Sequence, residues 1–197
     1  MKGNTTDRRV RKTQTVLHQA LMSLVLEKKY ESITVQDILD RADVGRSTFY
    51  VHYQNKDELL AAGLEHLKSL LNAAQSSSAP PGRLFERIIG FSRPMFEHSS
   101  GRRELLRSLL SSSAEPVVRR EIHSVLAAVV HQEVEREFRR RKRTNWPISP
   151  ELLTHSLVST YISMLTWWLN SKNPVSPEDM DAAYRHLFLP CLASIFG

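Results

Sequence analysis

The sequence has little of what marks secreted, membrane-spanning or disulfide-bonded proteins. It contains a single cysteine, Cys191, which has no disulfide partner within the chain; its apolar neighbours predict a buried small hydrophobic residue in a reducing compartment. No stretch approaches the roughly 18 apolar residues of a membrane span, and the polar residues up to Lys12 leave no room for the apolar core of a signal peptide. These absences predict a cytoplasmic protein without a membrane partner.

Signatures of catalysis and of metal binding are missing as well. There is no glycine-rich phosphate loop, nucleophile elbow or paired-carboxylate motif, and His98, His123 and His155 do not have the spacing of metal ligands. We therefore expect no enzymatic activity, no metal and no cofactor. Proline (9) and glycine (7) are few, and strand-like alternation of apolar and polar residues is scarce, which predicts an all-α fold.

The most informative segment reads SITVQDILDRADVGRSTFYVHYQNKDELL, at residues 32–60. It contains two short patterns with helical spacing on either side of a tight turn. Thr34, followed by Asp37 three residues later, forms a pattern typical of a capping box and predicts a helix over Val35–Arg41. After the turn, a second short helix is predicted over Arg46–Tyr53. This compact corner predicts a helix-turn-helix, the motif that places its second helix in the major groove of DNA.

The segment resembles the N-terminal domain of TetR/AcrR-type transcriptional regulators. Their recognition helix often reads T-[LF]-Y-x-[HY]-[FY], followed by x-[ND/S]-K-x-x-L. This sequence matches at Thr48, Phe49, Tyr50, His52, Tyr53, Asn55, Lys56 and Leu59. Two positions depart from the pattern, because Lys29 stands where many members have Gly and Gly45 replaces the usual Ser or Thr cap. The resemblance implies a three-helix DNA-binding domain over residues 1–75 and a helical regulatory and dimerisation domain over residues 76–197.

Side-chain chemistry predicts which residues of this segment read bases. Arg46, which follows the Gly45 cap at the start of the recognition helix, can donate two parallel hydrogen bonds to guanine. The amide of Gln36 can pair with adenine, and Ser47 and the methyl group of Thr48 can touch a base edge.

The resemblance implies further contacts with phosphates, which would fix the register of the protein on the duplex. These residues are Thr34, Tyr50, His52, Tyr53 and Lys56. Packing or capping within the domain is an alternative for His52 and Tyr53, whereas Phe49 is assigned to the core. A net charge of +6 favours a polyanionic partner but carries no sequence specificity.

The rest of the chain is predicted to be a series of helices. The first is expected over Arg8–Glu27, after a loose arm at residues 1–7. The stretch SSSAPPG, Ser76–Gly82, predicts the boundary between the two domains. Beyond it, a helix over Leu84–His98 is expected to kink or restart near Pro94. Later helices are predicted around Leu105–Leu110 and over Pro116–Arg143, Pro150–Asn170 and Pro177–Phe196.

The last two predicted helices have extensive apolar faces, which favour a homodimer through a twofold four-helix interface. The resemblance implies a pocket for a small hydrophobic or aromatic effector, although the same residue spacing is typical of plain core or of a dimer interface. The candidate pocket residues are Phe91, Met95, Phe96, Tyr161, Met164, Trp167 and Trp168.

Taken with the resemblance, these features predict a homodimeric repressor of transcription that binds an inverted-repeat DNA operator and is released by a small molecule. Two alternatives remain open. One is a TetR-like DNA binder that is controlled by a protein partner. The other is a DNA binder that acts as an activator or as an architectural factor.

Overall fold

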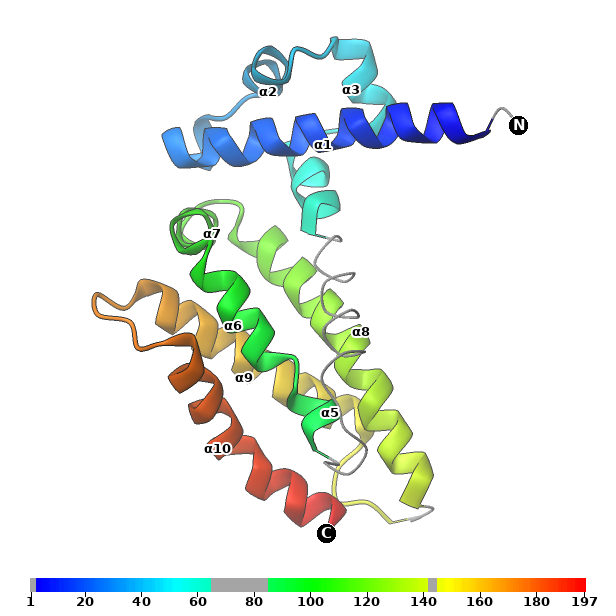
Figure 1. Ribbon diagram of the computed structural model, residues 1–197, viewed down its shortest axis with the longest axis vertical. Coiled ribbons are helices and arrows are strands. Elements are labelled where there is room, and N and C mark those ends of the chain that lie inside the picture. The colour runs from blue at the N-terminus through cyan, green and yellow to red at the C-terminus, as the bar shows by residue number, and fades with distance from the viewer. Residues whose placement is uncertain (1–2, 65–84, 142–144) are drawn as a thin grey trace. The chain divides into compact units, whose positions relative to one another are not determined.

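The structure, a computed structural model, describes residues 3–64, 85–141 and 145–197 (Figure 1). Within these ranges the regular secondary structure is entirely helical, which confirms the all-α prediction. None of the helices in these ranges is long and apolar enough to cross a membrane. The predicted boundary at Ser76–Gly82 lies outside the described residues.

The chain divides into two compact units. The first, termed the head, combines the residues up to Leu64 with Glu104–Arg119. The second, termed the body, combines the described residues from 85 to Arg103 with those from Arg120 to Gly197. A segment from the second half of the sequence thus belongs with the N-terminal helices.

The head is organised around α1 (Gly3–Glu27), which packs against α2 (Val35–Ala42) (Figure 1). Because α1 begins at Gly3, the prediction of a loose arm is wrong for residues 3–7. No proline stands between them and the rest of the helix, so the helical pattern continues toward the N-terminus. The 3-10 turn η1 (Tyr30–Ser32) leads into α2, and α3 (Arg46–His52) follows.

A further helix begins at Lys56 and continues through residue 64. Its start is capped by Asn55, whose side-chain oxygen accepts a hydrogen bond from the backbone N–H of Glu58 at 2.9 Å. Gly63 lets this helix approach α1, because a Cβ atom there would lie only 1.8 Å from the His18 ring. Fully buried apolar side chains from all of these helices form the core of the head: Leu17, Leu21, Ile38, Phe49 and Leu60.

The later segment of the head contains α7 (Arg103–Leu110), except for its first residue, and the start of α8 (Glu115–Arg141). Two hydrogen bonds connect it to the N-terminal helices. The Ser108 hydroxyl donates to the Val25 carbonyl at 3.2 Å, and the Ser113 backbone N–H donates to the Glu31 carboxylate at 2.7 Å. The second bond holds the pKa of Glu31 below its usual range.

The body contains α5 (Glu86–Ile89), α6 (Ser92–Ser100), most of α8, α9 (Pro150–Asn170) and α10 (Pro177–Phe196) (Figure 1). The last two helices begin and end as predicted. The break predicted near Pro94 lies earlier, at Gly90. Pro94 instead occupies the first turn of α6, where its missing N–H has no partner to lose.

The interior of the body is packed with aromatic rings from α6, α9 and α10. Phe91, which immediately precedes α6, and Phe96 both contact Tyr161 edge-on or at a tilt, with ring centroids 5.2 and 4.8 Å away. Phe96 also meets Trp168, at 5.6 Å. All four side chains are at most 1% exposed. This cluster supplies much of the apolar burial that stabilises the body.

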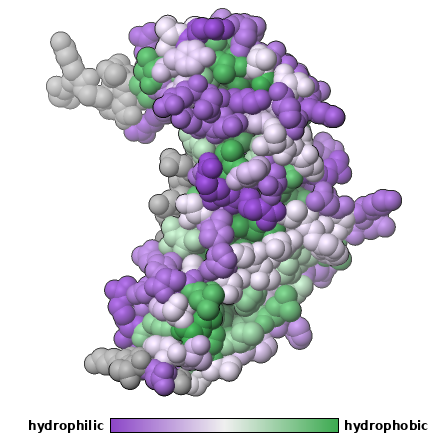
Figure 2. Space-filling view, turned by 180° about the vertical axis from the view of Figure 1, so that it is seen from behind, coloured by the Kyte–Doolittle hydropathy of each residue, from purple (hydrophilic) through white to green (hydrophobic). Residues whose placement is uncertain are grey.

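Other apolar residues lie on the outside of the same helices. Trp167 is 64% exposed and Leu187 is 53% exposed. Cys191 is exposed as well, so the prediction that it is buried is wrong. Its neighbour Leu192 points inward and is fully buried, which places Cys191 on the outer face of α10. On the face drawn in Figure 2, hydrophilic residues predominate over the head, whereas hydrophobic residues gather over the body.

Candidate nucleic-acid interface

The turn between α2 and α3 is defined at both ends by local contacts. At the start of α2, the Thr34 side chain accepts a hydrogen bond from the Asp37 backbone N–H at 3.1 Å, and the Asp37 carboxylate accepts from the Thr34 backbone N–H at 2.7 Å. This is the predicted capping box. At the end of α2, Asp43 adopts a left-handed conformation with a φ of 52°, which reverses the chain and lets α3 begin three residues later.

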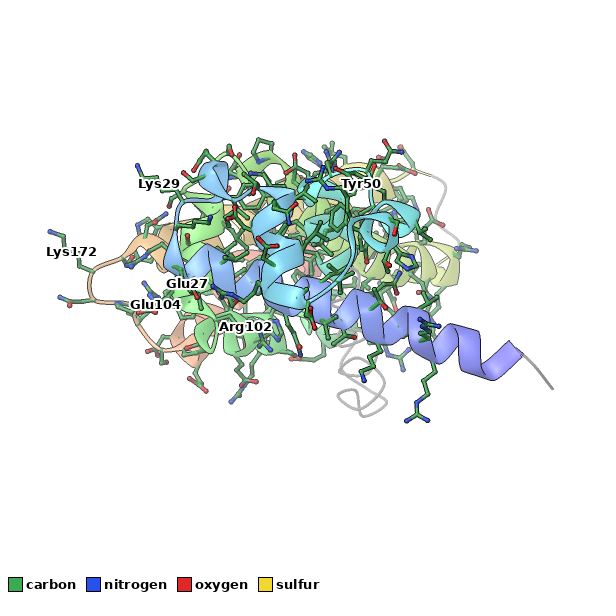
Figure 3. All side chains as sticks on the ribbon, turned by 90° about the horizontal axis from the view of Figure 1, so that it is seen from above. Glu27, Lys29, Tyr50, Arg102, Glu104 and Lys172 are labelled. Carbon is green, nitrogen blue, oxygen red and sulfur yellow. The ribbon has the colours of Figure 1, made fainter. Side chains whose placement is uncertain are left out.

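The recognition helix α3 has one buried face and one exposed face. Phe49 is completely buried and anchors the helix in the head. Gly45 caps the helix without a side-chain hydrogen bond, as expected for glycine. The residues predicted to approach DNA are exposed: Gly45, Arg46, Ser47, Thr48 and Tyr50. Tyr50, labelled in Figure 3, is 52% exposed although its ring still contacts Phe49.

The two predicted base readers are hydrogen-bonded to each other. Arg46 Nη2 donates to Gln36 Oε1 at 2.8 Å, which joins the start of α3 to α2. The amide nitrogen of Gln36 donates in turn to Asp40 Oδ1 at 2.7 Å. All three side chains are exposed, so this row of polar groups is accessible to a partner. Asp40 was not among the residues predicted from the sequence. Its position four residues after Gln36 on the same helix could have indicated a contact between the two side chains.

The residues predicted to contact phosphates differ in exposure. Thr34 is exposed and His52 is half-buried, whereas Tyr53 is only 7% exposed. The Tyr53 ring packs beside Phe49 with centroids 5.8 Å apart, and burial raises its pKa. This environment favours the packing role that was the alternative for Tyr53.

Lys56 is partly buried and bonded within the head. Its ammonium donates to the carbonyl oxygens of Tyr30 and Ile33, at 2.7 and 2.8 Å. The same nitrogen lies 4.4 Å from the centre of the Tyr30 ring, which adds a cation–π interaction. Lys56 therefore connects the turn before α2 to the helix that begins at Lys56 itself. One of its three N–H groups remains for an external partner.

The residues predicted to line an effector pocket are only partly together. Phe91, Phe96, Tyr161 and Trp168 meet in the interior of the body, Met95 is buried, and Met164 is half-buried. Trp167 is exposed, so its prediction as an interior lining residue is wrong. It precedes Trp168 directly, and consecutive residues of a helix face different directions.

Polar groups buried in the body were missed by sequence reasoning. Ser92 donates a short hydrogen bond to Asp181, which is 7% exposed and also accepts from Arg185 Nε at 2.7 Å. Burial raises the pKa of the Tyr161 hydroxyl well above its usual value, although a hydrogen bond with Ser99 acts in the opposite direction. The only hint of this network in the sequence is Asp181, an acidic residue that directly follows the apolar Met180.

One group of side chains in the body has the composition of a metal site. His131 and Glu135 on α8 and Glu151 on α9 bring a potential ligand atom each within 4.8 Å of one another. Each already interacts with protein groups: His131 contacts Thr154, Glu135 pairs with an arginine, and Glu151 accepts from its own backbone N–H and from Ser149. These partners account for the cluster without an ion.

The geometry of the head defines a class of protein. A capped α2, a tight left-handed turn and an α3 with an exposed polar face form a helix-turn-helix, which is the reading head of a DNA-binding transcriptional regulator. Comparison with known proteins agrees, since the family described as "Bacterial regulatory proteins, tetR family" matches residues 17–62. The head therefore belongs to the TetR family of DNA-binding domains.

Two individual relatives match about a quarter of the chain each. The uncharacterised HTH-type regulator YxbF of Bacillus subtilis is 46% identical over 55 residues, which cover 27% of this chain and 14% of that protein. The dhaKLM operon activator DhaS of Lactococcus lactis is 39% identical over 49 residues, 25% of this chain and 26% of that protein. Both matches therefore span well under half of the relatives' length.

Similarity over the whole chain comes from solved structures. A TetR regulator from Streptococcus agalactiae is 28% identical, with a TM-score of 0.66 over 92% of this chain and 96% of that one. This likeness extends beyond the head and confirms that the helical body follows the architecture of the family.

Proposed function

We propose that this protein is a homodimeric repressor that binds an inverted-repeat operator and leaves it when a small hydrophobic or aromatic molecule binds the body. The observation that carries the proposal is the exposed guanidinium of Arg46 in the first turn of α3, next to the exposed amide of Gln36. An arginine so placed at a recognition helix is suited to guanine, the base it recognises most specifically in the major groove.

Neighbouring residues would complete the contact with DNA. Ser47 and Thr48 share the exposed start of α3 with Arg46 and would touch base edges. Thr34, Tyr50, His52 and the remaining N–H of Lys56 would hold phosphates and so set the register. Tyr53, which is only 7% exposed, would support the helix from within.

A dimer is favoured by the exposed apolar side chains of the last two helices. Trp167 and Leu187 lie on α9 and α10, and each is more than half exposed. Burying such residues against a second copy would remove large apolar surfaces from water. A twofold dimer would also present two recognition helices, as an inverted repeat requires.

Release by an effector is supported by the aromatic interior of the body. Phe91, Phe96, Tyr161 and Trp168 would surround an apolar molecule, with Met95 and Met164 on the same helices, and the buried Tyr161 hydroxyl would supply a polar contact. Such a molecule must bind the DNA-incompetent arrangement more tightly than the competent one, because equal affinity shifts no equilibrium. A cytoplasmic location follows from this function.

The alternatives differ in what controls the head and in the sign of regulation. A protein partner could replace the small molecule, and an activator or an architectural factor would use the same reading helix. The relative DhaS is named an activator, so membership of the family leaves the sign open. Transcription from a promoter fused to the operator, with and without the protein, distinguishes repression from activation.

The test of the proposal is selection of genomic fragments by the purified full chain, followed by sequencing. We expect an inverted repeat to be enriched, and we expect sedimentation to give a dimer bound to it. Compounds that release the DNA can then be sought by thermal shift and fluorescence anisotropy. Failure to enrich any inverted repeat would overturn the proposal, and a repeat that no small molecule but only a pulled-down protein releases would favour the alternative.

A further inference from the structure

The row Asp40, Gln36 and Arg46 has an order that fixes the direction of each group. The Asp40 carboxylate can only accept, so the group that Gln36 turns toward it is the amide NH₂, at 2.7 Å. The amide oxygen of Gln36 is thereby left facing Arg46, whose guanidinium can only donate, at 2.8 Å. The three side chains form one chain of hydrogen bonds, in which Arg46 on α3 donates to Gln36 on α2 and Gln36 donates to Asp40 on the same helix.

We propose that Gln36 is a positioning residue for Arg46, and that Asp40 holds Gln36 in the required orientation. This inference rests on the proposed function and refines it, because it assigns one base reader to the row instead of two. Arg46 would contact the base, and Gln36 and Asp40 would act through it.

The stereochemistry of arginine permits this division of work. The guanidinium carries five N–H groups in a rigid plane, and the bond to Gln36 occupies one of them on Nη2. The remaining N–H groups still form the fork that pairs with guanine O6 and N7. An exposed arginine loses side-chain freedom when it binds, so holding the guanidinium in place beforehand lowers that cost.

The same contacts make an independent role for Gln36 less favourable. Pairing with adenine uses the amide as both donor and acceptor. In the head, one amide N–H is used by Asp40 and one lone pair of the amide oxygen by Arg46. One N–H and one lone pair remain on Gln36, but the two bonds fix the plane of the amide, so Gln36 could turn both groups toward an adenine only by rearranging these bonds.

Asp40 brings a second, opposite effect. Its carboxylate is exposed on the helix that supports the recognition helix, and a negative charge there repels DNA phosphates. A residue that weakens general attraction while orienting the base reader raises the ratio of specific to nonspecific binding. Removing it should therefore tighten nonspecific binding and weaken discrimination at the same time.

The experiment is a double-mutant cycle read on DNA, using the full chain and the enriched operator with all its single-base variants. Arg46→Ala should lose about tenfold to a hundredfold of discrimination at one base pair in each half-site. Gln36→Ala should lose at least about threefold at the same base pair. The double variant should match Arg46→Ala alone, because Gln36 has nothing left to position.

Asp40 is tested by a matched pair of variants. Asp40→Ala should raise affinity for nonspecific duplex, with the gain shrinking as salt rises, and should reduce discrimination at the Arg46 base pair. Asp40→Asn removes the charge but keeps an oxygen that can accept from Gln36, so it should raise nonspecific affinity while retaining discrimination. Circular dichroism melts of each variant check that the exposed substitutions leave the head folded.

The outcomes separate this inference from the function on which it rests. If Gln36→Ala relaxes a different base pair, and its effect adds to that of Arg46→Ala, Gln36 reads its own base and the inference is wrong. The same holds if Asp40→Ala leaves discrimination intact. If instead Arg46→Ala leaves every preference unchanged, or no operator is found, it is the proposed reading of DNA by α3 that fails.

Discussion

The recognition face of the head and the interior of the body use similar side chains in opposite ways. Tyr50 lies half exposed on α3, whereas Tyr161 is completely buried on α9. Polar groups of the head, such as Arg46 and Gln36, bond to one another in the open and retain donors for a partner. Those of the body, such as Asp181, are buried and held by neighbours.

Under the proposed function, this difference assigns DNA recognition to the head and effector binding to the body. A surface that meets DNA in water needs exposed, directed donors, and the fold supplies them by fixing the start of α3. An interior that binds an apolar ligand needs a shape complementary to that ligand and an apolar lining that excludes water, and both come from side-chain packing. Substitutions on the exposed face of the head should therefore impair DNA recognition, whereas substitutions in the interior of the body should lower stability.

The largest effect on stability is expected from Trp168→Ala in the body. The Trp168 ring is 1% exposed, its Nε1 donates to the Val175 carbonyl at 2.8 Å, and the Arg103 guanidinium lies 5.3 Å from its centre. Truncating it should lower the free energy of unfolding by about 3–5 kcal/mol, measured by urea denaturation.

The neighbouring Trp167→Ala is the matched control, because Trp167 is 64% exposed. It should leave the packing of the body intact and weaken self-association, measured by sedimentation equilibrium. Denaturation is therefore compared at several protein concentrations, since unfolding of a dimer depends on concentration. Equal losses of stability in the two variants, with unchanged association, would contradict the assignment of one tryptophan to the core and the other to an interface.

A smaller effect is expected from Thr34→Ala in the head. The Thr34 side chain caps α2 by accepting from the Asp37 N–H, and losing such a cap costs about 1 kcal/mol. Thr34→Ser keeps the hydroxyl and should restore most of the stability. Thermal melts of the two variants, with DNA affinity measured in parallel, separate the cap from a phosphate contact. Should both variants melt alike, the cap would contribute nothing.

The smallest expected effect is a dependence on pH. Hydrogen bonds from Lys28 and Thr34 hold the pKa of Asp37 well below its usual range. A depressed carboxyl pKa in the folded state adds stability above the unfolded pKa of about 3.9, and this contribution is lost as pH falls through the folded pKa.

We therefore expect Asp37→Asn to be less stable than the parent near neutral pH and to converge with it in strong acid. Urea denaturation across that range measures the difference. Lys28→Met should raise the pKa of Asp37, which NMR titration of the carboxyl carbon can follow. A stability difference between parent and Asp37→Asn that stays constant down to strong acid would rule out this linkage.

Sequence alone predicted the features that local rules determine, in the head and in the body. The capping box at Thr34 and the start of α3 at Arg46 follow from residues within a few positions of each other. Helical periodicity likewise predicted the bounds of α9 and α10.

The features that sequence reasoning missed depend on contacts between distant residues. Periodicity could not show that Lys56 would bond to the carbonyls of Tyr30 and Ile33, more than twenty positions away. Nor could it show that Cys191 would face outward while Leu192 faced in, since both stand in one apolar run. The orientation of Gln36 likewise required the positions of both Asp40 and Arg46.

The most direct test of the account is equilibrium binding of the parent chain and of Arg46→Ala to the selected operator and its single-base variants at one fixed salt concentration. We expect the variant to lose about 1–3 kcal/mol of preference at one base pair in each half-site, while keeping nonspecific, salt-dependent binding. An unchanged profile of base preference in Arg46→Ala would contradict the claim that α3 reads DNA through Arg46.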